Sequence, residues 1–277
     1  MNKQAKYSRG VLTGRGIEWT DYTWNPIAGC FHACAWEMPD GAIANCYAED
    51  QAIRMKSDKF YPDGFVHHYW KPELLKEPGK VKNPSRIFVG SMADVFGHWV
   101  PSEQIDAVLE TARNNPQHTF QFLTKNPRRA VEFADHIPAN CWIGASTPPN
   151  QMWNKPLSFD QRNRMFTSTL RALATLRQAG VTTWVSAEPL TIDAGAYIGF
   201  FAAMSGVRPI DWIVIGAASN GTKLYAPDEL LVRNAVEQCD RLEIPVFYKG
   251  NLKTLAFARD DWREAFVAKG VAAHGAP

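Results

Sequence analysis

Three of the five cysteines, Cys30, Cys34 and Cys46, fall within residues 30–46. Three residues separate the first two, and eleven precede the third. Three thiolates can hold three corners of a cubane iron–sulfur cluster and leave one iron free for an exogenous ligand, whereas closed electron-transfer clusters typically use four cysteines. The spacing therefore predicts a cluster whose open iron serves substrate or cofactor chemistry.

Zinc is the competing interpretation of the same cysteines. A Cys3His site would join them to His32 or His67. A disulfide framework is disfavoured, because the number of cysteines is odd and the N-terminus lacks the apolar stretch of a secretory signal. The other two cysteines, Cys141 and Cys239, lie in apolar patterns and are expected to be core thiols.

Polar residues also follow nearly every predicted strand. In a βα barrel the chemistry occurs where strands end, so these groups should converge at one mouth. Glu188 and Lys249 project toward that mouth, where they are expected to act in catalysis or to form a buried ion pair. The remaining polar groups at strand ends are Ser91, Asp94, Thr124, Lys125, Ser146, Thr147, Ser219 and Asn220.

Short apolar runs alternate with segments of helical period, which is typical of parallel strands covered on both faces. The fold class predicted is α/β, a complete or partial barrel of about seven parallel strands. We expect strands near 18–26 and at 86–91, 119–125, 141–147, 182–190, 211–217 and 244–250. We expect helices at 101–115, 127–136, 160–179, 226–241 and 254–268.

The composition fits one domain with a substantial core. The chain has 277 residues, 45% of them apolar and 21% charged, and its net charge is only +2. We expect a basic N-terminal tail over residues 1–16 and a single barrel domain over 17–277. No stretch has the roughly 20 apolar residues that cross a bilayer, so we expect no membrane partner and a cytoplasmic location.

Residues 54–86 form a predicted lid that is rich in basic and aromatic side chains. This segment has eight Lys or Arg residues against four Asp or Glu residues, interleaved with rings that include Tyr69 and Trp70. Basic groups can track phosphates while aromatic rings stack on bases, which would make Trp70 a substrate-binding residue. The alternative is a lid that closes the barrel and is packed by its own aromatic rings.

Several motifs together resemble one known family. These are "WNPIAGC" with "CYAE", "FVGSMADVF", "FQFLTKNPRR", "CWIGAST", "VSAEPL", "DWIVIGAASN" and "IPVFYKG". From about residue 17 to 255 they resemble the phage-associated three-cysteine-motif proteins, which are distantly related to radical S-adenosylmethionine (SAM) enzymes. The commonest radical SAM spacing has two residues before the third cysteine, so the eleven-residue segment "AWEMPDGAIAN" is a departure. It moves the aromatic residue usually found just before the third cysteine, and Tyr47 follows it instead.

The resemblance implies a radical-SAM-type barrel in which Cys30, Cys34 and Cys46 bind a four-iron four-sulfur cluster. The open iron would take the amino and carboxylate groups of SAM, and an electron donor would reduce the cluster. SAM cleavage would then allow hydrogen abstraction from the substrate. The resemblance also implies cofactor contacts, which we assign to Ser91 and Asp94 at the methionyl amine, Ser146 at the ribose and Tyr47 in the cysteine loop.

A phage association suggests a nucleic acid or modified nucleotide as substrate, in the cytoplasm of an infected host. The expected reaction is an isomerisation or other modification of a hypermodified thymine base in phage DNA. We expect Lys125, Asn220 and Trp70 to contact this substrate. Two alternatives stay open: a zinc-stapled nucleic-acid-binding module, and a metal-independent barrel hydrolase that uses Asp94 and Glu188 as paired carboxylates.

Overall fold

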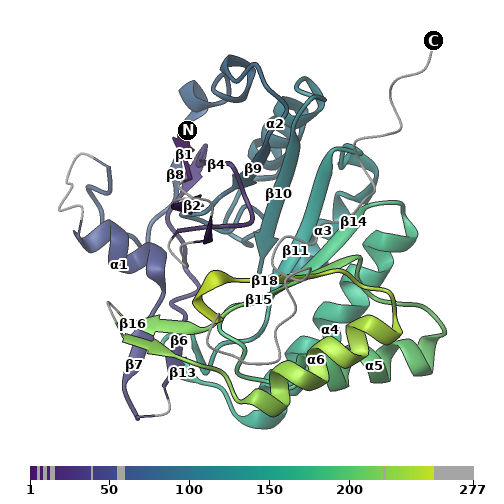
Figure 1. Cartoon of the computed structure of the whole chain (residues 1–277). Helices are drawn as coiled ribbons and strands as arrows, with labels where there is room; N and C mark the ends of the chain where they lie inside the picture. The colour runs from purple at the N-terminus through teal and green to yellow at the C-terminus, as the bar shows by residue number, and fades with distance from the viewer. Residues whose placement is uncertain are drawn as a thin grey trace.

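A computed structural model describes residues 1–4, 7–8, 11–12, 16–38, 40–54, 60–220 and 223–252. Its centre is an eight-stranded sheet of order β1-β4-β9-β10-β11-β14-β15-β18, shown in Figure 1. Seven of the strands run parallel, and β1 (Asn2–Lys3) pairs antiparallel with β4 at one edge. The parallel strands are β4 (Tyr22–Trp24), β9 (Arg86–Val89), β10 (Thr119–Thr124), β11 (Cys141–Ser146), β14 (Thr182–Ala187), β15 (Trp212–Ile215) and β18 (Val246–Tyr248).

The predicted α/β class and the seven parallel strands are confirmed. Each strand is nearly continuously apolar because both faces of the sheet are covered. Among the described residues no ladder joins β18 to β4, so closure into a complete barrel is not seen.

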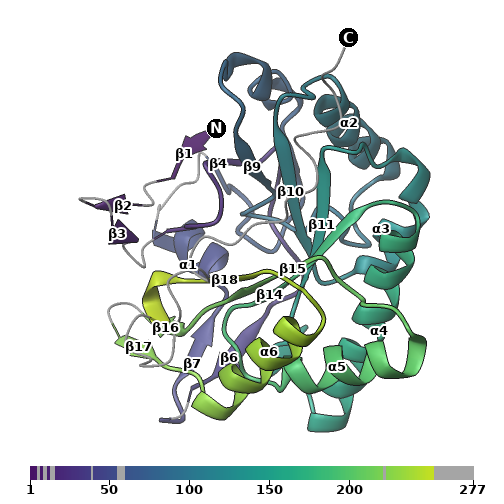
Figure 2. The same cartoon turned by 45° about the vertical axis from the view of Figure 1, so that its right-hand side comes forward.

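Helices cover one face of the sheet. Figure 2 shows α3 to α6 on one side and α1 with the β6–β7 hairpin on the other. The helices are α1 (Tyr47–Arg54), α2 (Ser102–Arg113), α3 (Pro127–Glu132), α4 (Phe159–Gln178), α5 (Ala194–Ser205) and α6 (Glu229–Arg241), with short 3-10 turns at Pro72–Leu74, Pro78–Lys80, Ala134–His136 and Gly250–Leu252. Four of the predicted helices are present, α1 and α5 were not predicted, and the helix expected at 254–268 lies outside the described residues.

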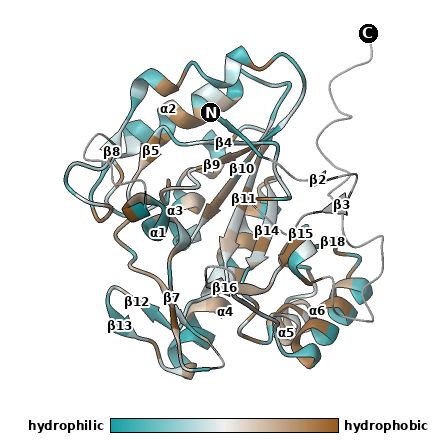
Figure 3. Cartoon of the chain, turned by 60° about the vertical axis from the view of Figure 1, so that its left-hand side comes forward, coloured by the Kyte–Doolittle hydropathy of each residue, from teal (hydrophilic) through white to brown (hydrophobic). Residues whose placement is uncertain are grey.

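The alternation of side chains along the strands builds two separate cores. Residues that point toward the helices, such as Ile143 and Val185, join the larger core, and these strands are the apolar centre in Figure 3. The opposite face carries a cluster of large rings, composed of Trp19, Phe88, Trp142, Trp184, Trp212 and Phe247 together with Val214. The large rings fill this face, whereas smaller polar residues such as Ser146 and Ser186 lie near the carboxyl ends of the strands.

Gly144 makes the ring cluster possible. A Cβ atom at this position would lie 2.2 Å from Cε2 of Trp184, which is the register neighbour of Gly144 on β14. Real Cβ atoms do not approach that closely, so the glycine gives the indole its place.

Short hairpins cluster at the carboxyl ends of the strands. The segment between Cys34 and Cys46 forms β6 (Ala35–Glu37) and β7 (Ile43–Asn45). This hairpin pairs with β12 (Gln151–Met152), which in turn pairs with β13 (Lys155–Pro156). The remaining short strands are β2 (Tyr7–Ser8), β3 (Val11–Leu12), β5 (Ile27–Ala28), β8 (Tyr69–Trp70), β16 (Ala218–Asn220) and β17 (Lys223–Tyr225).

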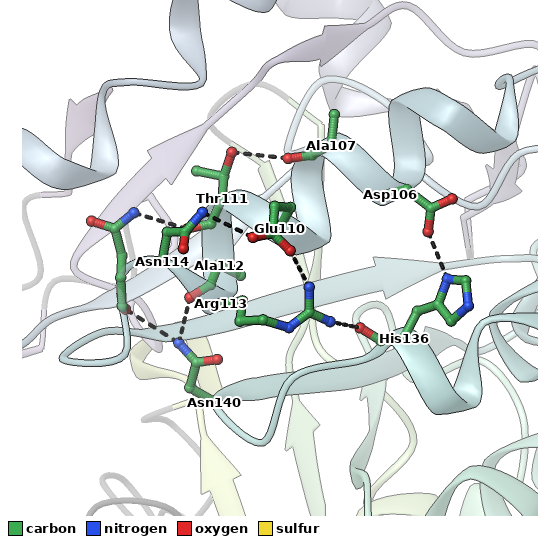
Figure 4. A network of polar contacts seen from close by, with 10 residues as sticks. Asp106, Ala107, Glu110, Thr111, Ala112, Arg113, Asn114, His136 and Asn140 are labelled. Atoms are coloured by element: carbon green, nitrogen blue, oxygen red, sulfur yellow. Dashed lines mark hydrogen bonds and ion pairs between the residues drawn. The ribbon is translucent and has the colours of Figure 1, made fainter.

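A polar network ties α2 to the loop before β11, as Figure 4 shows. Asn140 donates from Nδ2 to the Ala112 carbonyl at 2.9 Å, and Arg113 donates to the His136 carbonyl at 2.8 Å. Asn140 directly precedes β11, so this network lies toward the amino ends of the strands, away from the cysteines. In the described part of the chain, no helix combines the length and apolar character needed to cross a membrane.

Candidate functional site

The three cysteines come together just beyond the carboxyl end of β4. Cys34 is buried, and Cys30 and Cys46 are partly buried against Ala48, Phe65 and Met92. Burial is the largest cause of a raised pKa at Cys30 and at Cys34, and the charges of the neighbouring cysteines act in the same direction, so that the pKa of Cys34 rises to about 11. The three thiols are thus close enough to interact.

Close backbone packing fixes the turn that leads to Cys30. Gly29 has φ +82°, and a Cβ on it would lie 1.7 Å from the His67 carbonyl oxygen. Only glycine fits both that backbone conformation and that contact. The next amide, that of Cys30, donates to the Phe65 carbonyl at 3.1 Å. The lid segment therefore holds the cysteine loop through its backbone.

A buried acid and histidine connect the cysteine loop to the neighbouring strands. His32 lies between Cys30 and Cys34, and its Nε2 is 2.8 Å from Oδ2 of Asp94. The same oxygen accepts from the Lys125 amide at 2.8 Å, and Oδ1 accepts from the Phe96 amide at 3.1 Å. Burial raises the pKa of Asp94, but the hydrogen bonds to His32, Thr124 and Lys125 lower it more, so the net shift is downward. Asp94 is an ionised acceptor that is already engaged by the protein.

Ser91 and Tyr47 form a second connection near the thiols. Tyr47, at the start of α1, donates its hydroxyl to the Ser91 carbonyl in a short hydrogen bond. The Ser91 hydroxyl exchanges hydrogen bonds with the Asn25 amide, at 3.1 Å to Nδ2 and 3.2 Å to Oδ1. Tyr47 is 51% exposed as a whole, but desolvation of its hydroxyl raises the pKa of the phenol, and the charges of Cys46 and Glu188 raise it further. The Tyr47 hydroxyl is therefore near enough to both Cys46 and Glu188 to interact with them.

Glu188 and Lys249 form an ion pair at the far side of this end of the sheet. Lys249 Nζ lies 2.8 Å from Glu188 Oε1, and the two side chains are 14% and 16% exposed. Oε2 of Glu188 accepts from the Trp19 indole and from the Ser186 hydroxyl, both at 3.1 Å. Burial lowers the pKa of Lys249, but attraction to Glu188 and Glu18 raises it more. Lys249 is therefore a stable cation, and the pair matches the ion-pair alternative for these residues.

The matching family covers most of the chain. Residues 14–261 match the family described as "Protein of unknown function (DUF5131)". The chain belongs to this family. Among curated proteins, none matches the chain.

Solved structures of spore photoproduct lyase resemble this DUF5131 protein in fold. A cysteine-to-serine mutant of that enzyme gives a TM-score of 0.52 at 11% identity, covering 80% of this chain and 74% of the other. Another mutant, with bound AdoMet and dinucleoside spore photoproduct, gives 0.49 at 12% identity over 80% and 62%. The first likeness shows that the chain has a fold similar to that of spore photoproduct lyase.

A cluster and a single zinc ion are the two metal centres expected of the cysteines in this DUF5131 protein. The described residues include no group of three or more His, Cys, Asp or Glu side chains that could hold one metal ion. Zinc–sulfur bonds of about 2.3 Å would bring the thiolates of a tetrahedral zinc site to about 3.8 Å from each other. In a cubane cluster each thiolate binds a different iron, so the thiolates can lie farther apart. His32, a candidate fourth zinc ligand, already uses Nε2 with Asp94. The positive charge of a bound metal would offset the burial that raises the pKa of Cys30 and Cys34.

The other predicted site residues are less closely grouped. Ser146 ends β11 in register with Ser186, which hydrogen-bonds Glu188. Lys125 places Nζ 5.5 Å from the ring centre of Trp36, in the hairpin between Cys34 and Cys46, and its charge lowers the pKa of Cys34 against the larger effect of burial. The backbone of Asn220 pairs with Lys223, and its side chain lies outside the described part of the chain.

The rings of the lid contact one another. Tyr61 packs against Phe65 and Tyr69 with ring centres 5.9 and 5.6 Å apart, and Lys71 lies 5.4 Å above Tyr61. Trp70 pairs with Ile27 through β8 and packs against the larger core. These contacts match the alternative of a lid packed by its own rings.

The sequence interpretation missed two partners of Glu188. Trp19 and Ser186 both bind its Oε2, and Ser186 stands two residues before Glu188 in "VSAEPL". Strand alternation places residues two apart on one face, which is the signal that could have identified Ser186. Trp19 is 169 residues away from Glu188, and no local pattern indicates that contact.

Proposed function

We propose that this protein is a radical SAM-type enzyme. The observation that carries the proposal is the gathering of three interacting thiols at the carboxyl end of a parallel sheet, beside buried polar and charged groups. Three thiolates leave one iron of a cubane open, and the carboxyl ends of parallel strands are where α/β folds bind ligands. The fold likeness to spore photoproduct lyase supports the same class.

Cys30, Cys34 and Cys46 would hold the four-iron four-sulfur cluster. When bound and reduced by an electron donor, the cluster would supply the electron that cleaves SAM and thereby permits hydrogen abstraction from the substrate. The chain itself would position the reactants and exclude water. The short hairpins and the self-packed lid beside the cysteines suit that task.

The contacts refine the roles proposed for the cofactor residues. Asp94 orients His32 and anchors the cysteine loop, so its proposed role shifts from holding the SAM amine to supporting the site. Ser91, Tyr47 and Ser146 remain candidates for cofactor contacts, because they lie at strand or helix ends around the thiols. The cationic Lys249 with Glu188 would bind or orient the substrate, since a lysine with a raised pKa is a poor base at neutral pH.

For the substrate we propose a nucleic acid or modified nucleotide, with a hypermodified thymine of phage DNA as the specific case. The excess of basic residues in 54–86 supports this class. Trp70 and its neighbours make internal contacts, so base stacking would have to come from other rings. Lys125 and Asn220 stay proposed substrate contacts.

The hydrolase alternative has less support. It requires Asp94 and Glu188 to act together as an acid and a base. Asp94 is bound by His32 and two backbone amides, and Glu188 is bound by Lys249, Trp19 and Ser186. Both carboxylates are thus engaged by separate partners.

The proposal is tested by SAM cleavage. Anaerobically reconstituted protein should release 5′-deoxyadenosine when SAM and a strong reductant are added. Cys30→Ala, Cys34→Ala and Cys46→Ala should each abolish the release, whereas Cys141→Ala and Cys239→Ala, matched changes of buried core thiols, should retain it. Equal release from all five variants, or none from the reconstituted parent, would overturn the proposal.

A further inference from the structure

Arg162 is a buried arginine in the first turn of α4. Only 8% of it is exposed. All of its hydrogen bonds come from one terminal nitrogen, Nη2, which donates to the Thr191 hydroxyl at 2.7 Å and to the Pro148 and Thr191 carbonyls at 3.3 Å. These three acceptors are neutral.

The guanidinium of Arg162 has no counter-ion among the described residues. None of the ion pairs of that part of the chain includes it, and its Nε is buried without a hydrogen-bond partner. Burial alone lowers its pKa, and no carboxylate acts in the opposite direction. Buried charges in proteins are normally paired because desolvation of an isolated ion is costly, so an unpaired buried guanidinium calls for an anion.

Arg162 joins two loops that carry candidate site residues. Pro148 is two residues beyond Ser146 at the end of β11, and Thr191 is three residues beyond Glu188, which follows β14. Parallel strands place both loops at the carboxyl end of the sheet. The position is also the positive end of a twenty-residue helix, where a basic side chain is disfavoured; the first turn carries Asp160, which is exposed and forms no ion pair with Arg162 among the described residues.

We propose that Arg162 binds an anionic oxygen group, a carboxylate or a phosphate, of a ligand held at the loops that follow β11 and β14. A guanidinium binds either group through its planar N–H donors, and among the described residues only Nη2 of Arg162 is used. The inference rests on the proposed function in one respect, because SAM would offer a carboxylate and a nucleotide would offer a phosphate. The fold itself gives Arg162 neutral acceptors only, so the ligand completes the charge pairing.

The experiment compares ligand pairs that differ in the anion alone. SAM is paired with decarboxylated SAM, and thymidine 5′-monophosphate with thymidine, and each affinity is measured by calorimetry on the full chain. The variants are Arg162→Gln and Arg162→Lys. Arg164→Gln is the matched control, because it removes the same charge from an exposed position of the same helix.

For at least one pair, the parent should bind the anionic member at least about tenfold more tightly, the gain expected of a charge-assisted hydrogen bond. Arg162→Gln should reduce that preference, Arg162→Lys should keep more of it than Arg162→Gln does, and Arg164→Gln should keep it all. The ligand pair whose affinity difference depends on Arg162 shows whether the bound group is a carboxylate or a phosphate. An equal preference in Arg162→Gln and the parent would overturn the inference.

If a variant fails to fold, a second measurement can still be made on the parent protein alone. Its preference for the anionic ligand should fall as salt rises, because dissolved ions screen the attraction between the guanidinium and the incoming anion. No preference for either anion at low salt would overturn the inference without any variant. Iron uptake and SAM cleavage by the parent report separately on the proposed function, so the two can fail independently.

Discussion

Buried ionised side chains hold the site together at the scale of single residues. Asp94 bonds His32 in the cysteine loop, and Glu188 bonds Lys249 at the end of β18. Burial of a charged side chain is unfavourable unless its oppositely charged partner is buried beside it. Removal of one partner should therefore be worse than removal of both.

The Glu188–Lys249 pair gives the first prediction. Lys249→Met should lower the free energy of unfolding by about 3–5 kcal/mol, because Glu188 stays buried and uncompensated. The double variant Glu188→Gln with Lys249→Met should recover much of that loss. Urea unfolding of the parent, the two single variants Glu188→Gln and Lys249→Met, and the double variant forms a double-mutant cycle. If the two single losses of unfolding free energy simply add up in the double variant, the pairing is contradicted.

The same pair should make stability depend on alkaline pH. The folded pKa of Lys249 is raised above its ordinary value of 10.5, so the folded state holds the proton more tightly than the unfolded state does. The stabilisation is complete below pH 10.5 and is lost as pH rises through the folded value. The stability difference between the parent and the double variant should therefore fall above that pH and stay constant near neutrality.

Asp94 gives a further prediction at the residue scale. Asp94→Asn should lower the free energy of unfolding by about 1–3 kcal/mol without any cofactor, because it weakens the hydrogen bonds to His32, Phe96 and Lys125. Asp135→Asn, at an exposed position, is the matched control. Unchanged thermal unfolding combined with weakened SAM binding would show instead that Asp94 contacts the cofactor.

At the scale of elements, the lid and the inserted hairpin frame the cysteines. The lid contributes the Phe65 and His67 carbonyls beside Gly29 and Cys30. The hairpin between Cys34 and Cys46 pairs with β12, which explains how the eleven residues between these two cysteines are accommodated. Both elements are thus part of the support of the thiols.

Trp70 tests the role of the lid. Trp70→Ala should lower the free energy of unfolding by about 2–3 kcal/mol, less than for a fully buried ring, because Trp70 packs against the larger core while remaining partly exposed. Val66→Ala, at a residue that is 54% exposed, should have little effect. Thermal unfolding and DNA binding are measured on the same variants. A loss of DNA affinity with unchanged unfolding would mean that Trp70 binds bases.

The elements that the sequence predicts well are those with a strong local signal. The long apolar strands and the amphipathic helices α2, α4 and α6 agree closely with their predicted ranges. Helix α5 escaped prediction because "AGAYIGFFAAMS" is apolar on all sides and includes two glycines. The β6–β7 hairpin escaped because each strand has only three residues.

In the candidate site, too, residues with a local sequence signal were predicted and long-range contacts were not. The cysteines, Glu188 and Lys249 were predicted from residue type and from their place after strands. The contact between His32 and Asp94 was not, because 62 residues separate them and only the parallel pairing of β4 with β9 brings them together. Long-range pairing of this kind leaves no local pattern in a single sequence.

At the scale of the whole molecule, the parallel sheet gathers these parts at one end. Helices α2 to α6 bury the larger core, and the cluster of large rings fills the opposite face of the sheet. The polar ends of the strands are therefore left for ligands. The DUF5131 family match spans residues 14–261, and the fold likeness to spore photoproduct lyase covers 80% of the chain. The central claim is that its three gathered thiols hold an iron–sulfur cluster.

The most direct test is the iron and acid-labile sulfide content of the full chain after anaerobic reconstitution. We expect about four irons and four sulfides per chain and a brown protein. Cys34→Ala should lose the colour, and Cys239→Ala, which changes a core thiol, should keep it. Stoichiometric zinc with no iron uptake in the parent would contradict the account.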